Sequence, residues 1–244
     1  MTAVTRDSIA LRGAGVVIVN QPEKGFRFTQ DSLLLADFCR IKPRDKILEL
    51  GAGTGVISLL LAKKFPKASF VADEAERQAY GLLCRNIEEN CLSDRIAPVD
   101  RDVNYLSRSI APGTFDLIVT NPPYTRIGTG KKSPSAARQA ARQGPNAPLS
   151  AWLDRQDLLK NKGRFFLVFS AHRMMELMSF MRSRNLEPKR IRFVHSFQDK
   201  PASLILLEAV KSGGTGLEVL PPLIVHGPGG EYSKELIDIY GCAP

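Results

Sequence analysis

Three closely spaced glycines are the first residues whose pattern points to chemistry. The run Glu49-Leu-Gly51-Ala-Gly53-Thr54-Gly55 joins an apolar stretch to a segment with helical spacing. Glycine has no Cβ, so the backbone can turn sharply there and come close to a ligand. A dinucleotide site has Gly-x-Gly-x-x-Gly, with a pyrophosphate at the helix start. The Gly-x-Gly-x-Gly spacing departs from that pattern and favours a nucleoside without phosphates.

Acidic residues follow the next two apolar stretches. Glu74 comes about twenty residues after the glycine loop, where a carboxylate can accept hydrogen bonds from both hydroxyls of a ribose. Asp73 is adjacent, and neighbours on a strand point to opposite faces, so only one of the two acids is expected to serve; the spacing to the next helix favours Glu74. Farther on, Asp102 can accept from an adenine amino group while Val103 packs on the ring.

The stretch Asn121-Pro122-Pro123-Tyr124 is the most informative in the chain. The prolines fix φ near about −65° and remove backbone donors, so the chain is stiff there. The side-chain oxygen of Asn121 and the main-chain oxygen of Pro122 can then converge on the hydrogens of an NH2 group, which aims the nitrogen lone pair at an electrophilic methyl group. Tyr124 offers its ring to a flat substrate. The methylated nitrogen is cationic and acidic, so no general base is expected.

A basic loop follows Tyr124. It contains no acid and five basic residues: Arg126, Lys131, Lys132, Arg138 and Arg142. Beside the site, these side chains can hold RNA phosphates while Tyr124 stacks a base; the alternative is a solvated, mobile loop. The net charge of the chain is +9, from 34 Lys and Arg against 25 Asp and Glu, which favours a polyanionic partner without requiring one.

The elements that must position these residues alternate between strand and helix. Apolar runs with strand character occupy 46–50, 69–73, 96–100, 115–120, 163–170, 190–195 and 203–210. Helical spacing occurs at 31–39, with Asp31 as the cap, and at 56–64, 76–90, 152–159 and 172–185. This order predicts an α/β fold with a seven-stranded, mostly parallel sheet and helices on both faces. The last two strands are expected as an antiparallel pair at one edge.

Length and composition suit one domain. The chain has 244 residues, of which 43% are hydrophobic and 24% charged, values typical of a globular protein. We expect a strap and helix at 1–45, the core at 46–210 and a surface arm at 211–244. The sequence lacks a long apolar run, a leader peptide and paired cysteines, so we expect a cytoplasmic protein with free thiols and neither a metal site nor a membrane partner.

These motifs resemble a known group. The stretch 48–124 resembles the class I, Rossmann-like methyltransferases, and its Asn-Pro-Pro-Tyr element is similar to that of enzymes that methylate adenine amino or glutamine amide nitrogens. More narrowly, the segments 25–32, 121–130 with 133–134, 194–196 and 221–225 resemble the bacterial tRNA(valine) adenine-N6 methyltransferase family. That family modifies the adenosine just 3′ of the anticodon.

The resemblance implies a Rossmann-like fold, S-adenosylmethionine as the cofactor and tRNA as the partner. It also implies that Arg27, Phe28 and Thr29 lie over the cofactor as part of the strap, which Asp31 helps to order. Asn121 would border both the cofactor and the substrate. On this basis we expect N6-methylation of adenine in tRNA, at the position 3′ of the anticodon in tRNA(Val).

Three other functions remain open from the sequence. Methylation of a glutamine amide in a translation release factor presents nearly the same NH2 group to Asn121. Such enzymes usually carry an extra N-terminal helical domain, whereas about 45 residues precede the first expected core strand here. DNA adenine methylation usually needs an added recognition domain. A non-catalytic module that binds RNA or senses S-adenosylmethionine would not need the intact Asn121 to Tyr124 element.

Overall fold

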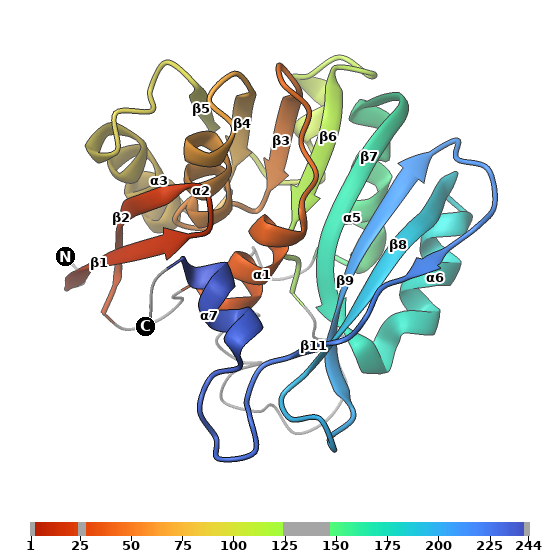
Figure 1. Cartoon of the computed structure of the whole chain (residues 1–244). Helices are drawn as coiled ribbons and strands as arrows, with labels where there is room; N and C mark the ends of the chain where they lie inside the picture. The colour runs from red at the N-terminus through yellow and green to blue at the C-terminus, as the bar shows by residue number, and fades with distance from the viewer. Residues whose placement is uncertain (1–2, 24–27, 124–146, 242–244) are drawn as a thin grey trace.

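The computed structural model describes residues 3–23, 28–123 and 147–241 (Figure 1). In this part of the chain, nine strands form the central sheet in the order β10-β8-β9-β7-β6-β3-β4-β5, and β11 also pairs with β8. Their bounds are β3 Lys46–Leu50, β4 Ser69–Asp73, β5 Ile96–Val99, β6 Phe115–Thr120, β7 Leu159–Ser170, β8 Leu186–His195, β9 Ala202–Lys211, β10 Glu218–Val219 and β11 Leu223–Ile224.

The sheet is mostly parallel, as predicted. The pairs from β5 through β4, β3 and β6 to β7 are parallel, whereas β9 is antiparallel to both β7 and β8. This arrangement confirms the α/β, Rossmann-like fold. One detail of the prediction was wrong, because the antiparallel strand β9 does not lie at the edge. It lies between β7 and β8, and the short strands β10 and β11 cover the outer side of β8.

Alternating apolar side chains explain why both faces of the sheet are covered. Ile47 and Phe166 pack into one core, while their neighbours Leu48 and Phe165 pack into the other. Because successive strand residues point to opposite faces, each face needs its own layer of helices. The first core includes α1 Gln30–Phe38, α2 Val56–Lys64, α3 Arg77–Glu89 and α7 Lys234–Tyr240. The second includes η1 Leu106–Arg108, α5 Leu149–Asp154, η2 Arg155–Leu158, η3 Ala171–Arg173 and α6 Met174–Arg182.

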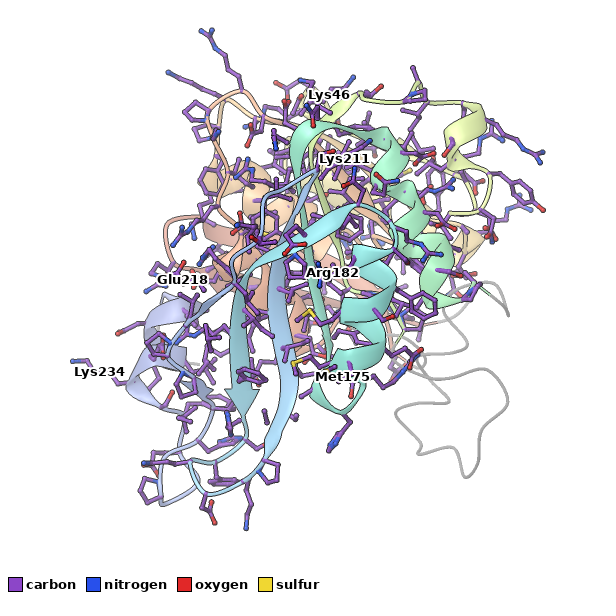
Figure 2. The ribbon with its side chains drawn as sticks, turned by 90° about the vertical axis from the view of Figure 1, so that its right-hand side faces the viewer. Lys46, Met175, Arg182, Lys211, Glu218 and Lys234 are labelled. Carbon is purple, nitrogen blue, oxygen red and sulfur yellow. The ribbon has the colours of Figure 1, made fainter. Side chains whose placement is uncertain are left out.

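Helix α6 shows how one face is buried and the other exposed. Leu177 and Met181 are fully buried against the second core. Met175 and Arg182 lie on the outer side of the same helix (Figure 2). Buried residues three to four positions apart form a single apolar stripe, so α6 packs flat against the sheet.

Two helix starts differ from the sequence prediction. Thr29 is the N-cap residue of α1, and Asp31 lies in the first turn, so Asp31 does not cap this helix as expected. Its negative charge is still favourable there because the helix dipole is positive at its start. The helix expected at 152–159 begins earlier, after Pro148, and gives way to η2 and then to β7.

The N-terminal segment, expected as a strap, contains a hairpin that the sequence did not predict. Strands β1 Val4–Leu11 and β2 Gly15–Pro22 pair with each other outside the main sheet. The backbone N–H of Asn20 donates to the Asn86 side chain at 2.7 Å, and Asn86 Nδ2 donates to the carbonyl of Thr54 at 2.9 Å. These bonds connect the hairpin to α3 and to the glycine loop.

The tail is not the surface arm that the sequence suggested. Leu223, Val225, Leu236 and Ile239 are all buried in the first core. Strand β11 extends the sheet beside β8, and α7 packs against α1 and β1 (Figure 1). The tail therefore completes the core. Within the described ranges, no helix is both long and apolar enough to cross a bilayer.

Candidate functional site

The strand register brings the predicted site residues to one edge of the sheet. Leu50 at the end of β3 pairs with Thr120 on β6 and with Asp73 on β4. These three strands are parallel, so the residues after their carboxyl ends begin side by side: Asn121, Gly51 and Glu74. Ligands of open parallel sheets bind beyond this edge.

The glycine loop has the conformation that its sequence requires. Gly51 and Gly53 have φ values of 64° and 59°, in the left-handed region that favours glycine. Gly55 also has a positive φ of 85°, but a Cβ there would lie 2.5 Å from Leu83 Cδ1. Gly55 therefore permits close packing of α2 against α3, while Gly51 and Gly53 shape the loop itself.

Two buried glutamates hold the loop in place. Glu49 accepts hydrogen bonds from the backbone N–H of Ser58 at 2.9 Å and from the Ser58 hydroxyl, at the start of α2. Burial raises the pKa of Glu49 to about 7, against the opposing effect of the Ser58 bonds. Glu74 accepts from the N–H groups of Gly53 at 2.7 Å and Glu76 at 2.8 Å. Burial raises the pKa of Glu74, and these backbone bonds limit the rise.

A small pocket brings the predicted nucleoside contacts together. Gly51, Glu74, Asp102 and Val103 all line it. Asp102 Oδ1 accepts from the N–H and side-chain amide of Asn104, at 2.8 and 2.7 Å, which folds the loop after β5 into a tight turn. Val103 is buried, so it is a fixed apolar surface on this loop.

Asp73 lines the same pocket, which strand alternation did not predict. Only one of Asp73 and Glu74 was expected to reach the site. Strand β4 ends at Asp73, and Glu74 is the first residue beyond the strand, so the strict alternation of faces stops between them. Trp152 of α5 is a further lining residue that the sequence did not single out, because its position depends on how α5 packs.

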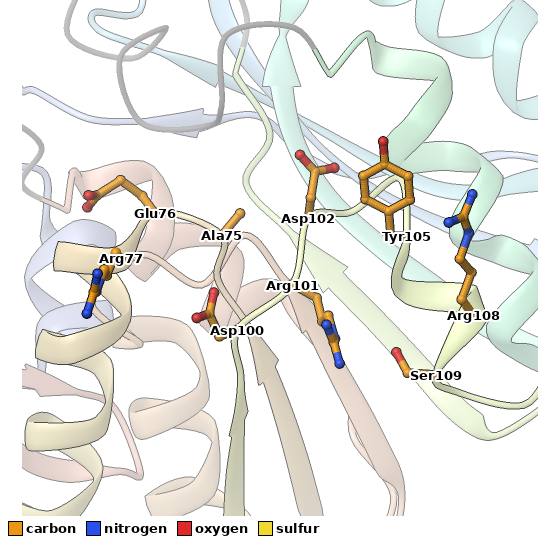
Figure 3. A pocket seen from close by; sticks show the side chains of 9 residues that line it. All are labelled: Ala75, Glu76, Arg77, Asp100, Arg101, Asp102, Tyr105, Arg108 and Ser109. Carbon is orange, nitrogen blue, oxygen red and sulfur yellow. The ribbon is translucent and has the colours of Figure 1, made fainter.

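A wider groove adjoins this pocket on the outside (Figure 3). Its volume is about 800 Å³, within the range of about 300 to 1,000 Å³ that is usual for ligand sites. Asp102 and Tyr105 come from the loop after β5, and Glu76 and Arg77 from the start of α3 (Figure 3). The guanidinium of Arg108 lies 4.7 Å from the centre of the Tyr105 ring.

Asn121 is oriented by a helix that is distant in sequence. Its Nδ2 donates to Ser32 Oγ of α1 at 3.2 Å, and Ser32 is buried. The other end of the amide, Oδ1, therefore points away from Ser32. Thr120 Oγ1 donates to the carbonyl of Leu50 at 3.0 Å, which fixes the end of β6 against β3. Pro122, next in the chain, is buried. The sequence did not predict the role of Ser32, because Ser32 lies 89 residues before Asn121 and the motif around Asn121 does not indicate the contact.

The predicted strap is only partly described. Phe28 packs against the first core, and its N–H donates to Gln21 Oε1 at 3.3 Å. Thr29 and Asp31 lie at the start of α1, the helix that carries Ser32. Seven predicted site residues fall outside the described ranges: Arg27, Tyr124, Arg126, Lys131, Lys132, Arg138 and Arg142.

The chemistry of the pocket suits a cationic nucleoside such as S-adenosylmethionine. Thr54 Oγ1 and Asp73 Oδ1 are buried and have no hydrogen-bond partner among the residues with assigned positions. Such groups are uncommon in proteins unless a ligand or water satisfies them. Three acidic residues, Asp73, Glu74 and Asp102, line the pocket with a single basic residue, Arg101, among its described lining residues, and the glycine backbone leaves room for a ligand to approach. The residues present therefore fit the cofactor.

Comparison with known proteins agrees with this chemistry. The family model described as methyltransferase small domain matches residues 27–184. A tRNA1(Val) (adenine(37)-N6)-methyltransferase of Vibrio campbellii is 28% identical over 218 residues, covering 89% of this chain and 88% of the relative. A protein of the same description from Porphyromonas gingivalis is 29% identical over 229 residues, covering 90% and 89%.

Solved structures share the fold. A predicted O-methyltransferase from Agrobacterium tumefaciens has a TM-score of 0.70 at 21% identity, covering 88% of this chain and 98% of that one. The 16S rRNA N2 G1207 methyltransferase of T. thermophilus, solved with AdoMet and guanosine, has a TM-score of 0.62 at 22% identity, covering 86% and 51%. The chain belongs to the methyltransferase small domain family and is a class I methyltransferase that uses S-adenosylmethionine.

Proposed function

We propose that this enzyme methylates N6 of adenine in tRNA, at the adenosine 3′ of the anticodon of tRNA(Val). The observation that carries the proposal is the placement of Asn121 at the end of β6, with its amide NH2 held by Ser32 at 3.2 Å. In this orientation the amide oxygen is the end of the side chain opposite to Ser32. The names of the relatives, whose chains match this one almost end to end, support adenine in tRNA as the substrate.

S-adenosylmethionine is proposed to bind to the glycine loop and to the acidic residues next to it. The cofactor supplies a methyl group on a positively charged sulfur. Gly51 and Gly53 allow close backbone approach, and Glu74 accepts hydrogen bonds from the ribose hydroxyls. Asp102 accepts from the adenine amino group, and Val103 packs on the ring. Glu49 acts through the loop, because its carboxylate already binds the start of α2.

On the substrate side, Asn121 Oδ1 and the main-chain oxygen of Pro122 accept the two hydrogens of the target NH2 group. The stiff prolines keep these oxygens in place, so the target amino group is already oriented before methyl transfer begins. Holding both hydrogens aims the nitrogen lone pair at the methyl group. Tyr124 stacks on the base, and the methylated nitrogen then loses a proton to water.

The RNA is proposed to bind through the basic loop that follows Tyr124. Its five basic residues supply contacts for phosphates on both sides of the flipped base. The net charge of +9 supports this role, since a positive field attracts a polyanion over long range. We infer that the positive charge serves binding and the Asn121 to Tyr124 element serves the reaction.

A labelling experiment tests the assignment. Purified enzyme is incubated with radiolabelled S-adenosylmethionine and either unfractionated tRNA or a purified translation release factor. We expect label in tRNA, and nucleoside mass spectrometry should find it as N6-methyladenosine. Label in the release factor would move the assignment to glutamine N5-methylation. Label in neither acceptor would overturn the choice of substrate class.

A further inference from the structure

Two buried polar groups line the small pocket without a partner. Asp73 is 2% exposed and Trp152 is 3% exposed. Neither Asp73 Oδ1 nor Trp152 Nε1 has a hydrogen-bond partner in the portion of the chain that is described. Both residues line the pocket that also contains Glu74, Asp102 and Val103. No role proposed so far uses either group.

The sheet places Asp73 toward the helix that carries Trp152. The preceding residue, Ala72, packs into the first core with α2 and α3. Adjacent strand residues point to opposite faces, so Asp73 belongs to the face of the second core, which contains Trp152. The pocket thus has a wall on the side of the second core, here called the inner wall, made by Asp73 and Trp152, and Glu74 and Asp102 line the same pocket.

The two groups offer a distinct hydrogen-bonding pattern. Burial raises the pKa of Asp73 to about 8, and the nearby carboxylates of Glu74, Asp102 and Asp100 add to this rise. At neutral pH the acid form prevails, and a protonated carboxyl has both an O–H donor and a C=O acceptor. The indole of Trp152 adds one N–H donor. Adenosine presents matching groups, because its ring nitrogens accept and its amino and ribose hydroxyl groups donate.

We infer that Asp73 and Trp152 bind the adenosine part of the cofactor from the inner wall of the pocket, in addition to the contacts assigned to Glu74 and Asp102. This inference rests on the adenosine pocket proposed above and is independent of the RNA substrate. It makes Asp73 a binding residue in its own right.

Calorimetric binding of S-adenosylhomocysteine, the cofactor after loss of its methyl group, tests the inference without any acceptor. At about pH 7, Asp73→Asn keeps a neutral hydrogen-bonding group, so we expect affinity within about twofold of the wild type. Asp73→Leu fills the space but forms no hydrogen bond, and we expect about tenfold weaker binding. Trp152→Phe removes only the N–H donor and part of the ring, for a loss of about fivefold.

A second ligand locates the contact. Methylthioadenosine carries the nucleoside without the amino-acid part. We expect the Asp73→Leu and Trp152→Phe variants to lose the same factor for this ligand as for S-adenosylhomocysteine. A loss confined to S-adenosylhomocysteine would place the contact on the amino-acid part and overturn the inference.

Two further variants separate this inference from the pocket assignment. If Glu74→Ala and Asp102→Ala bind S-adenosylhomocysteine as the wild type does, the proposed pocket itself is wrong. If they weaken binding while Asp73→Leu and Trp152→Phe do not, only the inner-wall contact fails, and the two groups enclose ordered water instead. Circular dichroism shows whether each variant folds. If Asp73→Leu does not fold, the affinity of Trp152→Phe for S-adenosylhomocysteine tests the inner-wall contact.

Discussion

The two sides of the site are built in different ways. On the cofactor side, the acidic groups bond to residues of the same part of the core: Asp102 to Asn104, 2 residues away, Glu49 to Ser58, 9 residues away, and Glu74 to Gly53, 21 residues away. On the substrate side, Asn121 bonds to Ser32, 89 residues away. The cofactor side is therefore fixed mainly by segments of the core, although Asn86 also connects the glycine loop to the N-terminal hairpin. The substrate side is complete only when the N-terminal helix has docked.

Both ends of the chain contribute to that docking. Helix α1 buries Leu33, Leu34 and Leu35 in the first core. Its first residue, Gln30, donates through Nε2 to the hydroxyl of Tyr240 in α7 at 3.1 Å. The tail thus supports the helix that orients Asn121. We therefore expect variants on the cofactor side to change cofactor affinity, and variants on the substrate side to change the rate of methyl transfer.

The largest effect is expected at Asn121. Asn121→Ala removes an oxygen that orients the amino group, so kcat/KM for tRNA should fall about 100- to 1,000-fold, in line with the loss of one pre-organised catalytic hydrogen bond. Affinity for S-adenosylhomocysteine, measured by calorimetry, should change little. Asn161→Ala, on an exposed residue of β7, is the matched control. A rate close to that of the wild type would remove Asn121 from the reaction.

The next largest effect is expected on the cofactor side. Glu74→Ala deletes a buried carboxylate that binds Gly53 and faces the pocket. Hydrogen bonds of charged groups contribute about 1.5 to 3 kcal/mol, so cofactor affinity should fall about 10- to 100-fold. With saturating cofactor, kcat should remain within about threefold. Glu88→Ala on the exposed side of α3 is the control. A lower kcat with unchanged affinity would contradict the separation of the two sides.

Ser32→Ala tests whether the contact between α1 and Asn121 affects only the substrate side of the site. Loss of one neutral hydrogen bond should allow the amide to rotate, lowering kcat about three- to tenfold and leaving cofactor affinity unchanged. Ser69→Ala, at the opposite end of β4, should behave as the wild type. Equal losses in kcat and in cofactor affinity would show that α1 supports both sides.

The smallest effect concerns stability and pH. The raised pKa of Asp73, about 8, means that the folded protein holds this proton more tightly than the unfolded chain. The contribution of this bound proton to the free energy of unfolding is fully present below the ordinary pKa of an aspartate. It is lost as the pH rises towards about 8. The Asp73→Asn side chain cannot ionise, so the Tm of this variant minus that of the wild type should increase by about 2 to 4 °C between about pH 5 and pH 8.5. A constant difference across this range would argue against a buried, protonated acid.

The sequence predicts the central strands well, because their apolar runs are buried on both faces. The observed bounds of β3, β4 and β6 match the expected ranges, and Asn121 and Glu74 follow strand ends as expected. The tail was mispredicted because β10 and β11 depend on pairing with β8, a contact that local pattern does not encode. A run of three apolar residues beside prolines, Leu223 to Val225, resembles a surface segment until its partner strand is known.

The same reason limits prediction of the site. The glycine loop and Asp102 belong to short motifs, so spacing alone can identify them. Ser32 and Trp152 acquire their positions from helix packing. Ser32 ends the segment 25–32 that carries the family resemblance, but its contact with Asn121 cannot be inferred from that segment, and no motif marks Trp152. Asp73 was set aside by strand alternation, which holds from Ala72 to Asp73 but not from Asp73 to Glu74, because β4 ends between these two residues.

One measurement tests the proposed reaction most directly. The enzyme is given labelled S-adenosylmethionine and a tRNA(Val) transcript with either adenosine or guanosine immediately 3′ of the anticodon. We expect one methyl group per adenosine transcript, found as N6-methyladenosine at that position, and none on the guanosine transcript. Equal label on both transcripts, or label at another nucleotide, would contradict the assignment of this adenine as the group that Asn121 holds.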